Sequence, residues 1–475
     1  MDTYLWTAGQ AMAATGGVAQ DDWHVEGISI DSRMIEPGDM FVAIRGPRFD
    51  GHDFTADAIA AGATVSMVDH HPGAVPTDAP LLEVKDTTLA LEDMARAARQ
   101  RTSARVIAVT GSVGKTGTKE GIRLALEDQG PTVASLGSLN NHWGVPLSLA
   151  RLPADTAFGV FEIGMNHPDE ITPLSQMVRP DVAVITNVEA VHSAFFDSVE
   201  QIADAKAEIF DGMGADGIAV LNRDNEQFDR LRKAAIATGL KTIIGFGIHP
   251  EAEVLAVDVR TDGQGSDIKA MINGVEIEYR LGVPGRHWVN NSLAILAAVN
   301  AAGADIRIAA QALGGMTGLK GRGQRHTVEI PGGTFVVIDE SYNASPVSMN
   351  AALEVLGQIQ PDGGGRRIAV LGDMLELGTD WEAKHAGLVE ILIAQKINLV
   401  FTAGQYMDAL WDVLPKSMRG ANDFSALNLG PKVTAMVRPG DVVVVKGSHG
   451  SNTGPIVEAL LDMAHSKTLE PAAKG

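Results

Sequence analysis

A short strand, a glycine turn and the start of a helix follow one another between residues 106 and 120, and they constrain the fold more than any other segment. The four apolar residues at 106–109 predict a short buried strand. Gly111 and Gly114 then mark a turn, and Lys115-Thr116 opens a run that is compatible with a helix. A strand that passes through such a turn into a helix indicates an α/β unit built on a parallel sheet.

The same segment has the architecture that holds the phosphates of a nucleotide. Glycines let backbone N–H groups approach phosphate oxygens, and a helix N-terminus favours their negative charge. Lys115 can reach the β- and γ-phosphates, and the Thr116 hydroxyl can bind Mg²⁺. The loop is shorter than the standard one, because Val109 stands where a first glycine is usual. An ordinary strand-to-helix turn is the alternative interpretation. The predicted phosphate-binding residues are Gly111, Ser112, Val113, Gly114, Lys115, Thr116 and Gly117.

Composition favours a globular protein with several domains. The chain has 475 residues, enough for two to four domains, and it is 45% hydrophobic and 20% charged. It contains no apolar run long enough for a membrane span, and its N-terminus lacks the basic flank and apolar core of a signal peptide. The absence of cysteine excludes disulfides and thiolate metal sites, and it agrees with a cytoplasmic location.

The net charge limits the partners that we expect. A formal charge of -21 argues against nonspecific binding to DNA or RNA. An anionic substrate such as a nucleotide must therefore be met by a local cluster of positive groups.

Three segments, 1–103, 104–326 and 327–475, predict three domains. Near-continuous apolar strands alternate with helices, which indicates parallel sheets covered on both faces. Alternating strands around 254–259 and 268–280 suggest an antiparallel insertion, and glycine and proline near 327–333 suggest a hinge. The other predicted strands are 27–30, 40–44 and 64–68 in the first segment, 106–109, 158–163, 182–186, 218–221 and 242–244 in the second, and 335–338, 367–371, 399–402 and 442–445 in the third. Helices are predicted at 56–63 and 92–101.

Polar residues at the ends of these strands are candidates for the chemistry, because open α/β sheets bind ligands there. Glu162 closes the strand at 158–163, and His192 follows the strand at 182–186. A carboxylate and an imidazole beside the phosphate loop could hold Mg²⁺ directly or through water, together with Thr116. Lys206 lies in an alanine-rich helical stretch, where periodicity alone favours a surface lysine paired with Asp204 or Glu208.

Motifs along nearly the whole chain resemble those of the Mur ligases. This resemblance implies an ATP-dependent enzyme that forms amide bonds during bacterial peptidoglycan precursor synthesis. It also implies a central P-loop-type parallel sheet, a Rossmann-like C-terminal domain and a smaller α/β N-terminal domain. The motifs are Thr110-Gly-Ser-Val-Gly-Lys-Thr116, Asn140-Asn-His-Trp-Gly-Val-Pro146, Glu162-Ile-Gly164, Ile185-Thr-Asn187, Ala205-Lys-Ala-Glu-Ile209 and Gly285-Arg-His287 with Asn291.

Further motifs narrow the resemblance to the branch that joins D-Ala-D-Ala to UDP-N-acetylmuramoyl-tripeptide. They are Asp31-Ser-Arg33, Pro37-Gly-Asp-Met-Phe-Val-Ala43, Arg48-Phe-Asp-Gly-His-Asp53, Asp339-Glu-Ser-Tyr-Asn-Ala-Ser-Pro346 and Leu371-Gly-Asp-Met-Leu-Glu-Leu-Gly378. The alternative is the sibling ligase that adds the third amino acid to UDP-muramoyl-dipeptide. That sibling typically carries Asp-Asn-Pro-Arg, and this tetrapeptide does not occur here.

The resemblance also implies roles for individual residues. Lys206 becomes a carbamylated lysine that helps hold a second Mg²⁺, next to Glu162 and His192. Asn291, Arg322, Asp339 and Tyr342 become contacts of ATP, with Asp339 at the ribose. The UDP-sugar substrate is assigned to Asp31, Ser32, Arg33, Phe49, Gly51, His52, Asn140 and Asn141. A monomer that uses ATP and Mg²⁺ and binds small-molecule substrates is expected.

The chain departs from the usual motifs at three positions. Trp288 stands where an asparagine usually follows the histidine of Gly-x-His, and Glu340 and Ser345 replace an aspartate and an asparagine. Asn291 keeps the second of the two adenine-side asparagines.

Two other classes of function remain open at this point. A GTPase or kinase could use the same loop, although the nearest match to the guanine-reading Asn-Lys-x-Asp is Asn222-Arg-Asp224, which lacks the spacing. A nucleotide-sensing module without catalysis is the second. Folylpolyglutamate synthases share the central loop but generally lack a uridine-nucleotide domain like residues 1–103.

Overall fold

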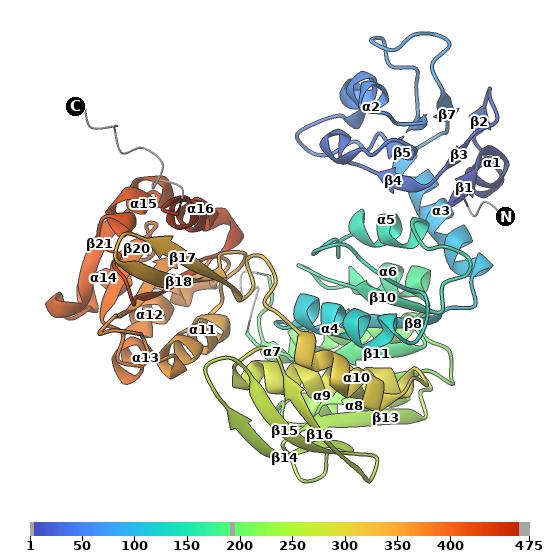
Figure 1. Cartoon of the computed structure of the whole chain (residues 1–475). Helices are drawn as coiled ribbons and strands as arrows, with labels where there is room; N and C mark the ends of the chain where they lie inside the picture. The colour runs from blue at the N-terminus through green and yellow to red at the C-terminus, as the bar shows by residue number, and fades with distance from the viewer. Residues whose placement is uncertain (1–3, 191–194, 465–475) are drawn as a thin grey trace, which may run out of the picture.

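The computed structural model describes residues 4–190 and 195–464 of the chain. Figure 1 shows three α/β units in chain order, and each is built on its own main sheet. We call them the N-terminal, central and C-terminal units. The predicted α/β class with three domains is confirmed. None of the helices in the described ranges combines the length and apolar character needed to cross a bilayer.

The N-terminal unit contains a five-stranded sheet in the order β2-β7-β6-β5-β4, next to a small β1–β3 ribbon. Strands β4 to β7 run parallel to one another, and β2 is antiparallel to β7. The strands are β1 Trp6–Thr7, β2 Val18–Ala19, β3 His24–Val25, β4 Gly27–Ser29, β5 Asp39–Val42, β6 Val65–Val68 and β7 Leu81–Glu83. The helices are α1 Ala8–Thr15, α2 Thr55–Ala60 and α3 Thr87–Arg101, with short 3-10 helices η1 Ser32–Met34 and η2 Gly51–Phe54.

Helix α3 joins this unit to the central one. It packs against α5 Gly144–Ala150 and α6 Ile171–Val178 of the central unit as well as against α1. Arg99 donates to the carbonyl oxygens of Val178 and Arg179, and the Trp6 indole donates to the carbonyl of Ala150. The two units therefore share one continuous apolar core and are fixed to each other.

The central unit is a nine-stranded sheet in the order β16-β15-β14-β13-β12-β11-β8-β10-β9. Its strands are β8 Arg105–Thr110, β9 Thr132–Ala134, β10 Phe158–Glu162, β11 Val182–Ile185, β12 Ile218–Asn222, β13 Thr242–Gly247, β14 Val254–Thr261, β15 Ser266–Ile272 and β16 Val275–Leu281. Besides α5 and α6, its helices are α4 Lys115–Glu127, α7 Val199–Ala207, α8 Phe228–Ala237, α9 Arg286–Ala301 and α10 Ile306–Ala312, with η3 Glu208–Gly212 and η4 Leu313–Gly315.

Burial on both faces explains the apolar character of the central strands. In β8, Val106 and Ala108 face the core under α3, α5 and α6, whereas Ile107 and Val109 face the core under α4 and α9. Successive side chains of a strand point to opposite faces, so both sets must be apolar. The predicted antiparallel strands are confirmed as β14 to β16, and they extend the same sheet instead of forming a separate one.

The C-terminal unit is a six-stranded sheet in the order β17-β18-β22-β19-β20-β21, with apolar clusters on both faces. Its strands are β17 Gln324–Ile330, β18 Gly333–Glu340, β19 Arg367–Gly372, β20 Leu399–Ala403, β21 Arg419–Asp423 and β22 Val442–Lys446. Its helices are α11 Pro346–Gln358, α12 Trp381–Ala386, α13 Leu388–Ala394, α14 Asp408–Val413, α15 Ala426–Thr434 and α16 Gly454–Asp462, with η5 Gly378–Asp380, η6 Lys416–Met418 and η7 His449–Ser451.

The hinge expected at 327–333 is wrong in its position. These residues belong to the antiparallel hairpin of β17 and β18, with Ile330 paired to Gly333 across the turn. The hairpin is held by the C-terminal sheet, so the connection between the units lies upstream, in residues 316–323. The boundary predicted between 326 and 327 accordingly falls inside β17.

Candidate active site

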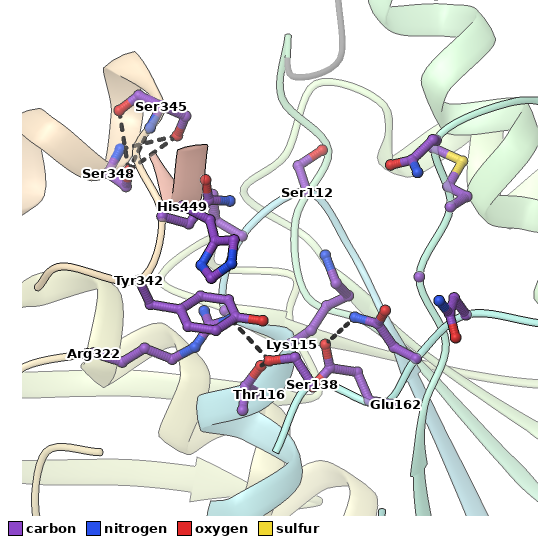
Figure 2. A pocket seen from close by; sticks show the side chains of 18 of the residues that line it. Ser112, Lys115, Thr116, Ser138, Glu162, Arg322, Tyr342, Ser345, Ser348 and His449 are labelled. Atoms are coloured by element: carbon purple, nitrogen blue, oxygen red, sulfur yellow. Dashed lines mark hydrogen bonds between the residues drawn. The ribbon is translucent and has the colours of Figure 1, made fainter. Parts of the chain in front are cut away.

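A cleft of about 870 Å³ lies where the central and C-terminal units face each other. The phosphate loop and the first turn of α4 form one wall, and residues 342–348 and 448–450 form the opposite wall. Figure 2 shows the side chains of both walls pointing into the same space. The strand C-termini of two parallel sheets therefore meet here, where such sheets bind ligands.

The loop from Gly111 to Gly114 follows β8 and leads into α4, as the sequence predicts. Gly111 and Gly114 have φ angles of +147° and +88°, which residues with a side chain rarely adopt. Lys115 donates to the Gly111 carbonyl oxygen over 2.7 Å, so its side chain folds back over the loop. The lysine ammonium therefore lies beside the loop that leads into the N-terminus of α4, where an anion is favoured.

Helix α9 lies against the same loop and brings two of the predicted residues to it. Asn291 lies beside Gly114, where an added Cβ would come within 2.8 Å of its Oδ1. The Trp288 ring packs on Gly117, so a Cβ there would collide with the ring. Trp288 and Asn291 both line the cleft.

Positive charge is concentrated at the loop despite the acidic chain. Burial lowers the pKa of Lys115, the Glu162 carboxylate opposes this shift, and the Arg322 guanidinium adds to it. Burial also lowers the pKa of Lys206 well below its usual value, and the charge of Lys115 lowers it further. Lys115 and Arg322 are two cations held close together, and they favour the binding of an anion.

Glu162 is the buried carboxylate of the site. It is 1% exposed, and its Oε1 accepts a 2.7 Å hydrogen bond from the Asn140 side chain. No described residue donates to its Oε2. A buried carboxylate oxygen without a partner is costly, and a hard cation such as Mg²⁺ would satisfy it. With the Thr116 hydroxyl on the same cleft wall, the oxygen donors present fit Mg²⁺.

Lys206 is not the surface residue that periodicity favours. It lies in α7, is 2% exposed, and is close enough to Lys115 for the two charges to interact. Asp204, its suggested surface partner, instead binds Arg230. Lys206 is not among the residues that line the cleft. His192 lies outside the described residues.

Arg322 and Tyr342 meet at the boundary between the units. The Arg322 guanidinium lies 4.2 Å from the centre of the Tyr342 ring, and both residues line the cleft. Asp339 does not line it. Its carboxylate accepts from the backbone N–H groups of Gly321 and Ser341 and from the Ser341 hydroxyl, at 2.6–3.0 Å. A ribose contact by Asp339 stays a prediction.

The substrate residues predicted in the N-terminal unit lie away from this cleft. Arg33 pairs with Asp31 at 2.6 Å, and Ser32 lies with them in η1. Phe49 is 70% exposed. Gly51 packs so closely on the backbone of Ile44 that a side chain would not fit.

His52 is buried in this structure, and its substrate role stays a prediction. Its Nε2 accepts from the Asp69 N–H over 3.1 Å, so its proton is on Nδ1, which lies 2.6 Å from Asp50 Oδ1. Asn140 and Asn141, by contrast, line the cleft, and Asn141 accepts from the Gly144 N–H at the start of α5.

Several cleft residues have no predicted role. Ser138 lies between Thr116 and Arg322, and Lys446 pairs with Glu340 at 3.1 Å and donates to the Asn343 carbonyl. His287 lines the cleft, and desolvation there lowers its pKa. Polar residues at strand ends are the available signal for Lys446, because it closes β22. No comparable local signal marks Ser138, which follows β9 in an irregular loop.

The family models assign the three units to one class of enzymes. Residues 24–104 match the description "Mur ligase family, catalytic domain", residues 109–299 match "Mur ligase middle domain", and residues 321–449 match "Mur ligase, glutamate ligase domain". The chain therefore belongs to the Mur ligase family, as its motifs indicate.

Curated relatives specify one member of that family. The chain is 32% identical to the UDP-N-acetylmuramoyl-tripeptide–D-alanyl-D-alanine ligase of Rickettsia prowazekii, over 96% of this chain and 99% of the relative. It is 33% identical to the ligase of the same name from Escherichia coli, over 92% and 94% of the two chains.

Solved structures agree with these relatives. A MurF crystal structure from Acinetobacter baumannii matches with a TM-score of 0.82 and 31% identity, over 96% of this chain and 99% of that one. MurF from Thermotoga maritima in complex with ADP matches with a TM-score of 0.75 and 26% identity, over 93% and 98%. A 2,6-diaminopimelate ligase matches with a TM-score of 0.52 at 17% identity, which reflects the shared fold alone.

Proposed function

We propose that this chain is an ATP-dependent ligase that joins D-Ala-D-Ala to UDP-N-acetylmuramoyl-tripeptide. The observation that carries the proposal is the cation cluster at the start of α4, in a chain of net charge -21, beside a buried carboxylate oxygen that no described residue satisfies. This arrangement suits a nucleoside triphosphate with its metal ion. The sibling ligase is not favoured, because the full-length relatives carry the dipeptide-adding name.

The reaction must make a carboxylate reactive toward an amine. A carboxylate oxygen of the tripeptide attacks the γ-phosphorus of ATP, and ADP leaves. The acceptor amine then attacks the carbonyl carbon of the acyl phosphate, loses a proton, and expels phosphate. The first step brings two anions together, and Lys115 and the N–H groups of the loop offset this repulsion. The two-unit cleft limits the access of water to the acyl phosphate.

The resident metal ion would be held by groups on the central unit. Thr116, Glu162, His192 and a carbamate on Lys206 are the ligands that we propose for Mg²⁺, which neutralises charge on the phosphates when bound. The lowered pKa of Lys206 favours its neutral amine, and the neutral amine is the form that adds to CO₂.

We assign the nucleotide-sugar end of the substrate to the N-terminal unit. Asp31, Ser32, Arg33, Phe49, Gly51 and His52 are the proposed contacts there, with Asn140 and Asn141 nearer the reacting carboxylate. Arg322, Tyr342, Asp339 and Asn291 are the proposed contacts of ATP, with the phosphate loop. We further propose a cytoplasmic monomer.

An acceptor panel in a phosphate-release assay tests the proposed function. With ATP and UDP-N-acetylmuramoyl-tripeptide present, D-Ala-D-Ala should stimulate phosphate release, whereas diaminopimelate, lysine, D-alanine and L-Ala-L-Ala should do so poorly. The free amine must lie within about 3–3.5 Å of the acyl phosphate, and an acceptor of the wrong length or handedness loses that placement. Stimulation by diaminopimelate on UDP-muramoyl-dipeptide instead would assign the chain to the preceding step.

A further inference from the structure

The loop between β9 and α5 is fastened to the helix that begins at the phosphate loop. Lys119 lies one turn after Lys115 in α4 and is fully buried. Its ammonium donates to the carbonyl oxygens of Ser135 and Gly137, the latter over 3.0 Å, and pairs with Glu120. Residues 135–138 therefore keep a fixed position relative to the N-terminus of α4.

This loop places one hydroxyl group between two groups of the nucleotide site. Ser138 Oγ lies 3.1 Å from Nη2 of Arg322 and 3.4 Å from Oγ1 of Thr116. Figure 2 shows Ser138 between these two side chains, with Tyr342 above them. Arg322 stacks on Tyr342 of the C-terminal unit. A single hydroxyl thus connects the loop, the start of α4 and the opposite wall of the cleft.

The hydrogen-bonding capacity of these groups fixes how they can interact. A guanidinium only donates, so Ser138 Oγ accepts from Arg322. A hydroxyl that binds a metal ion through an oxygen lone pair must direct its proton elsewhere. Ser138 Oγ lies within hydrogen-bonding distance of Thr116 Oγ1, and it has a second lone pair to accept the proton.

We propose that Ser138 is a positioning residue that orients the Thr116 hydroxyl toward Mg²⁺ and holds Arg322 at the phosphate site. It acts through these two side chains and links the nucleotide site to the C-terminal unit through Tyr342. The proposal rests on the proposed use of ATP and Mg²⁺. It extends that function by assigning a residue that no family motif in the sequence marks.

Binding of the nonhydrolysable analogue AMPPCP, measured by calorimetry over a series of Mg²⁺ concentrations and in EDTA, tests the proposal. Ser138→Val and Ser138→Thr are a matched pair of nearly equal shape, and only threonine keeps the hydroxyl. Ser138→Val removes a hydrogen bond to a charged group, so it should weaken binding at saturating Mg²⁺ about tenfold or more. Its loss in EDTA should be smaller, and Ser138→Thr should bind like the wild type.

The outcomes separate this proposal from the proposed function. Equal affinity of the valine and threonine variants at every Mg²⁺ concentration would overturn it. A loss in Ser138→Val that is the same in EDTA and in Mg²⁺ would overturn the role at Thr116. Failure of the wild type to bind AMPPCP would instead refute the proposed function itself. Ser417→Ala, an exposed serine in η6, is the control for nonspecific effects, and thermal melting checks that each variant folds.

Discussion

Lys115 interacts with two charged groups, and the balance between them sets its role. Arg322 repels it, while Glu162 attracts it. Without an anionic ligand, this set of charges is unfavourable at close range in a partly buried site. The phosphates of ATP would relieve the repulsion, which makes the cations effective for binding and for stabilising the transferred phosphoryl group.

Replacing Lys115 by alanine should therefore abolish ligation while the protein stays folded. Loss of such a fixed charge commonly lowers the rate by roughly 10²–10³-fold or more. Steady-state phosphate release and circular dichroism measure the two properties. Lys233→Ala, at an exposed position in α8, is the matched control and should keep full activity. A folded Lys115→Ala enzyme with near-normal turnover would show that the loop is not the phosphate site.

Burial of the Lys206 amine should lower the free energy of unfolding. Its pKa is lowered in the folded state, so below the unfolded value of about 10.4 the unfolded chain binds a proton that the native chain does not. Lys206→Met should thus stabilise the fold at pH 7 in CO₂-free buffer, because methionine keeps the apolar stem and has no amine that must stay unprotonated in the native state. The increase in the free energy of unfolding should become smaller as the pH rises from 7 toward 10. Ligase activity should be lost at every pH. Urea denaturation at both pH values measures this increase, and a gain that does not depend on pH would contradict this assignment.

Single residues also show where the sequence is ambiguous. The Asp339 motif is recognisable, but the same carboxylate can face a ligand or its own backbone, and here it accepts from Gly321 and Ser341. His52 is predicted at the substrate, and in the structure its ring nitrogens contact the Asp50 carboxylate and the Asp69 backbone N–H. Whether such a side chain faces a ligand or the protein itself depends on the packing around its loop, and the local sequence does not encode that packing.

At the scale of elements, α4 and α9 approach closely because α4 carries a glycine opposite a tryptophan. The Trp288 ring occupies the space that a side chain at Gly117 would need. Trp288 is buried at the contact between the helices, and its position follows from this fit. The residue that departs from the family motif therefore has a structural role next to the phosphate loop.

This contact predicts that two substitutions depend on each other. Gly117→Ala should destabilise the wild-type protein, because the new methyl group meets the Trp288 ring. In a Trp288→Ala background, itself less stable by about 3–5 kcal/mol, the same change should be neutral or stabilising, since alanine favours a helix by up to about 1 kcal/mol over glycine. Denaturant titration of the four proteins gives the coupling energy. Additive effects would mean that the ring does not limit the space at Gly117.

The strands that the sequence predicts are those with long apolar runs. β8, β10 and β22 are buried on both faces, and their composition follows directly from that burial. β9 and β17 were missed because they lie at sheet edges, where side chains of mixed polarity suffice. The antiparallel strands in β14–β16 are predicted because apolar and polar residues alternate along the sequence there.

At the scale of the whole molecule, the three units contribute to one proposed reaction from different sides. The central and C-terminal units line most of the cleft, and Glu92 and Arg96 of α3 add to it, whereas the predicted nucleotide-sugar residues of the N-terminal unit are not in its lining. Shared core packing fixes the N-terminal unit to the central one. Movement is therefore expected between the central and C-terminal units, through residues 316–323, where Gly321 and Gly323 have positive φ angles.

Closure of the cleft on ligands is the expected movement. AMPPCP and UDP-N-acetylmuramoyl-tripeptide together should decrease the radius of gyration measured by small-angle X-ray scattering, because both units gain contacts with the same ligands. Either ligand alone should have a smaller effect. Unchanged dimensions with both ligands at saturation would show that the units do not close.

The Ser138–Arg322 contact illustrates why this level of organisation is not readable from the sequence. The two residues are 184 positions apart, and the contact depends on how two separately folded units face each other. The phosphate loop was predictable because its strand, turn and helix are contiguous. The opposite wall of the cleft was identified in part, through the motif that contains Tyr342.

The fate of the oxygen atoms tests the central claim most directly. If the tripeptide carboxylate attacks ATP and the amine of D-Ala-D-Ala then displaces phosphate, one carboxylate oxygen must leave in the phosphate. With both terminal carboxylate oxygens of UDP-N-acetylmuramoyl-tripeptide labelled with ¹⁸O, mass spectrometry should find one labelled oxygen in each phosphate released, and this release should require D-Ala-D-Ala. Phosphate without the label, or labelled phosphate that forms equally without the dipeptide, would contradict ligation through an acyl phosphate.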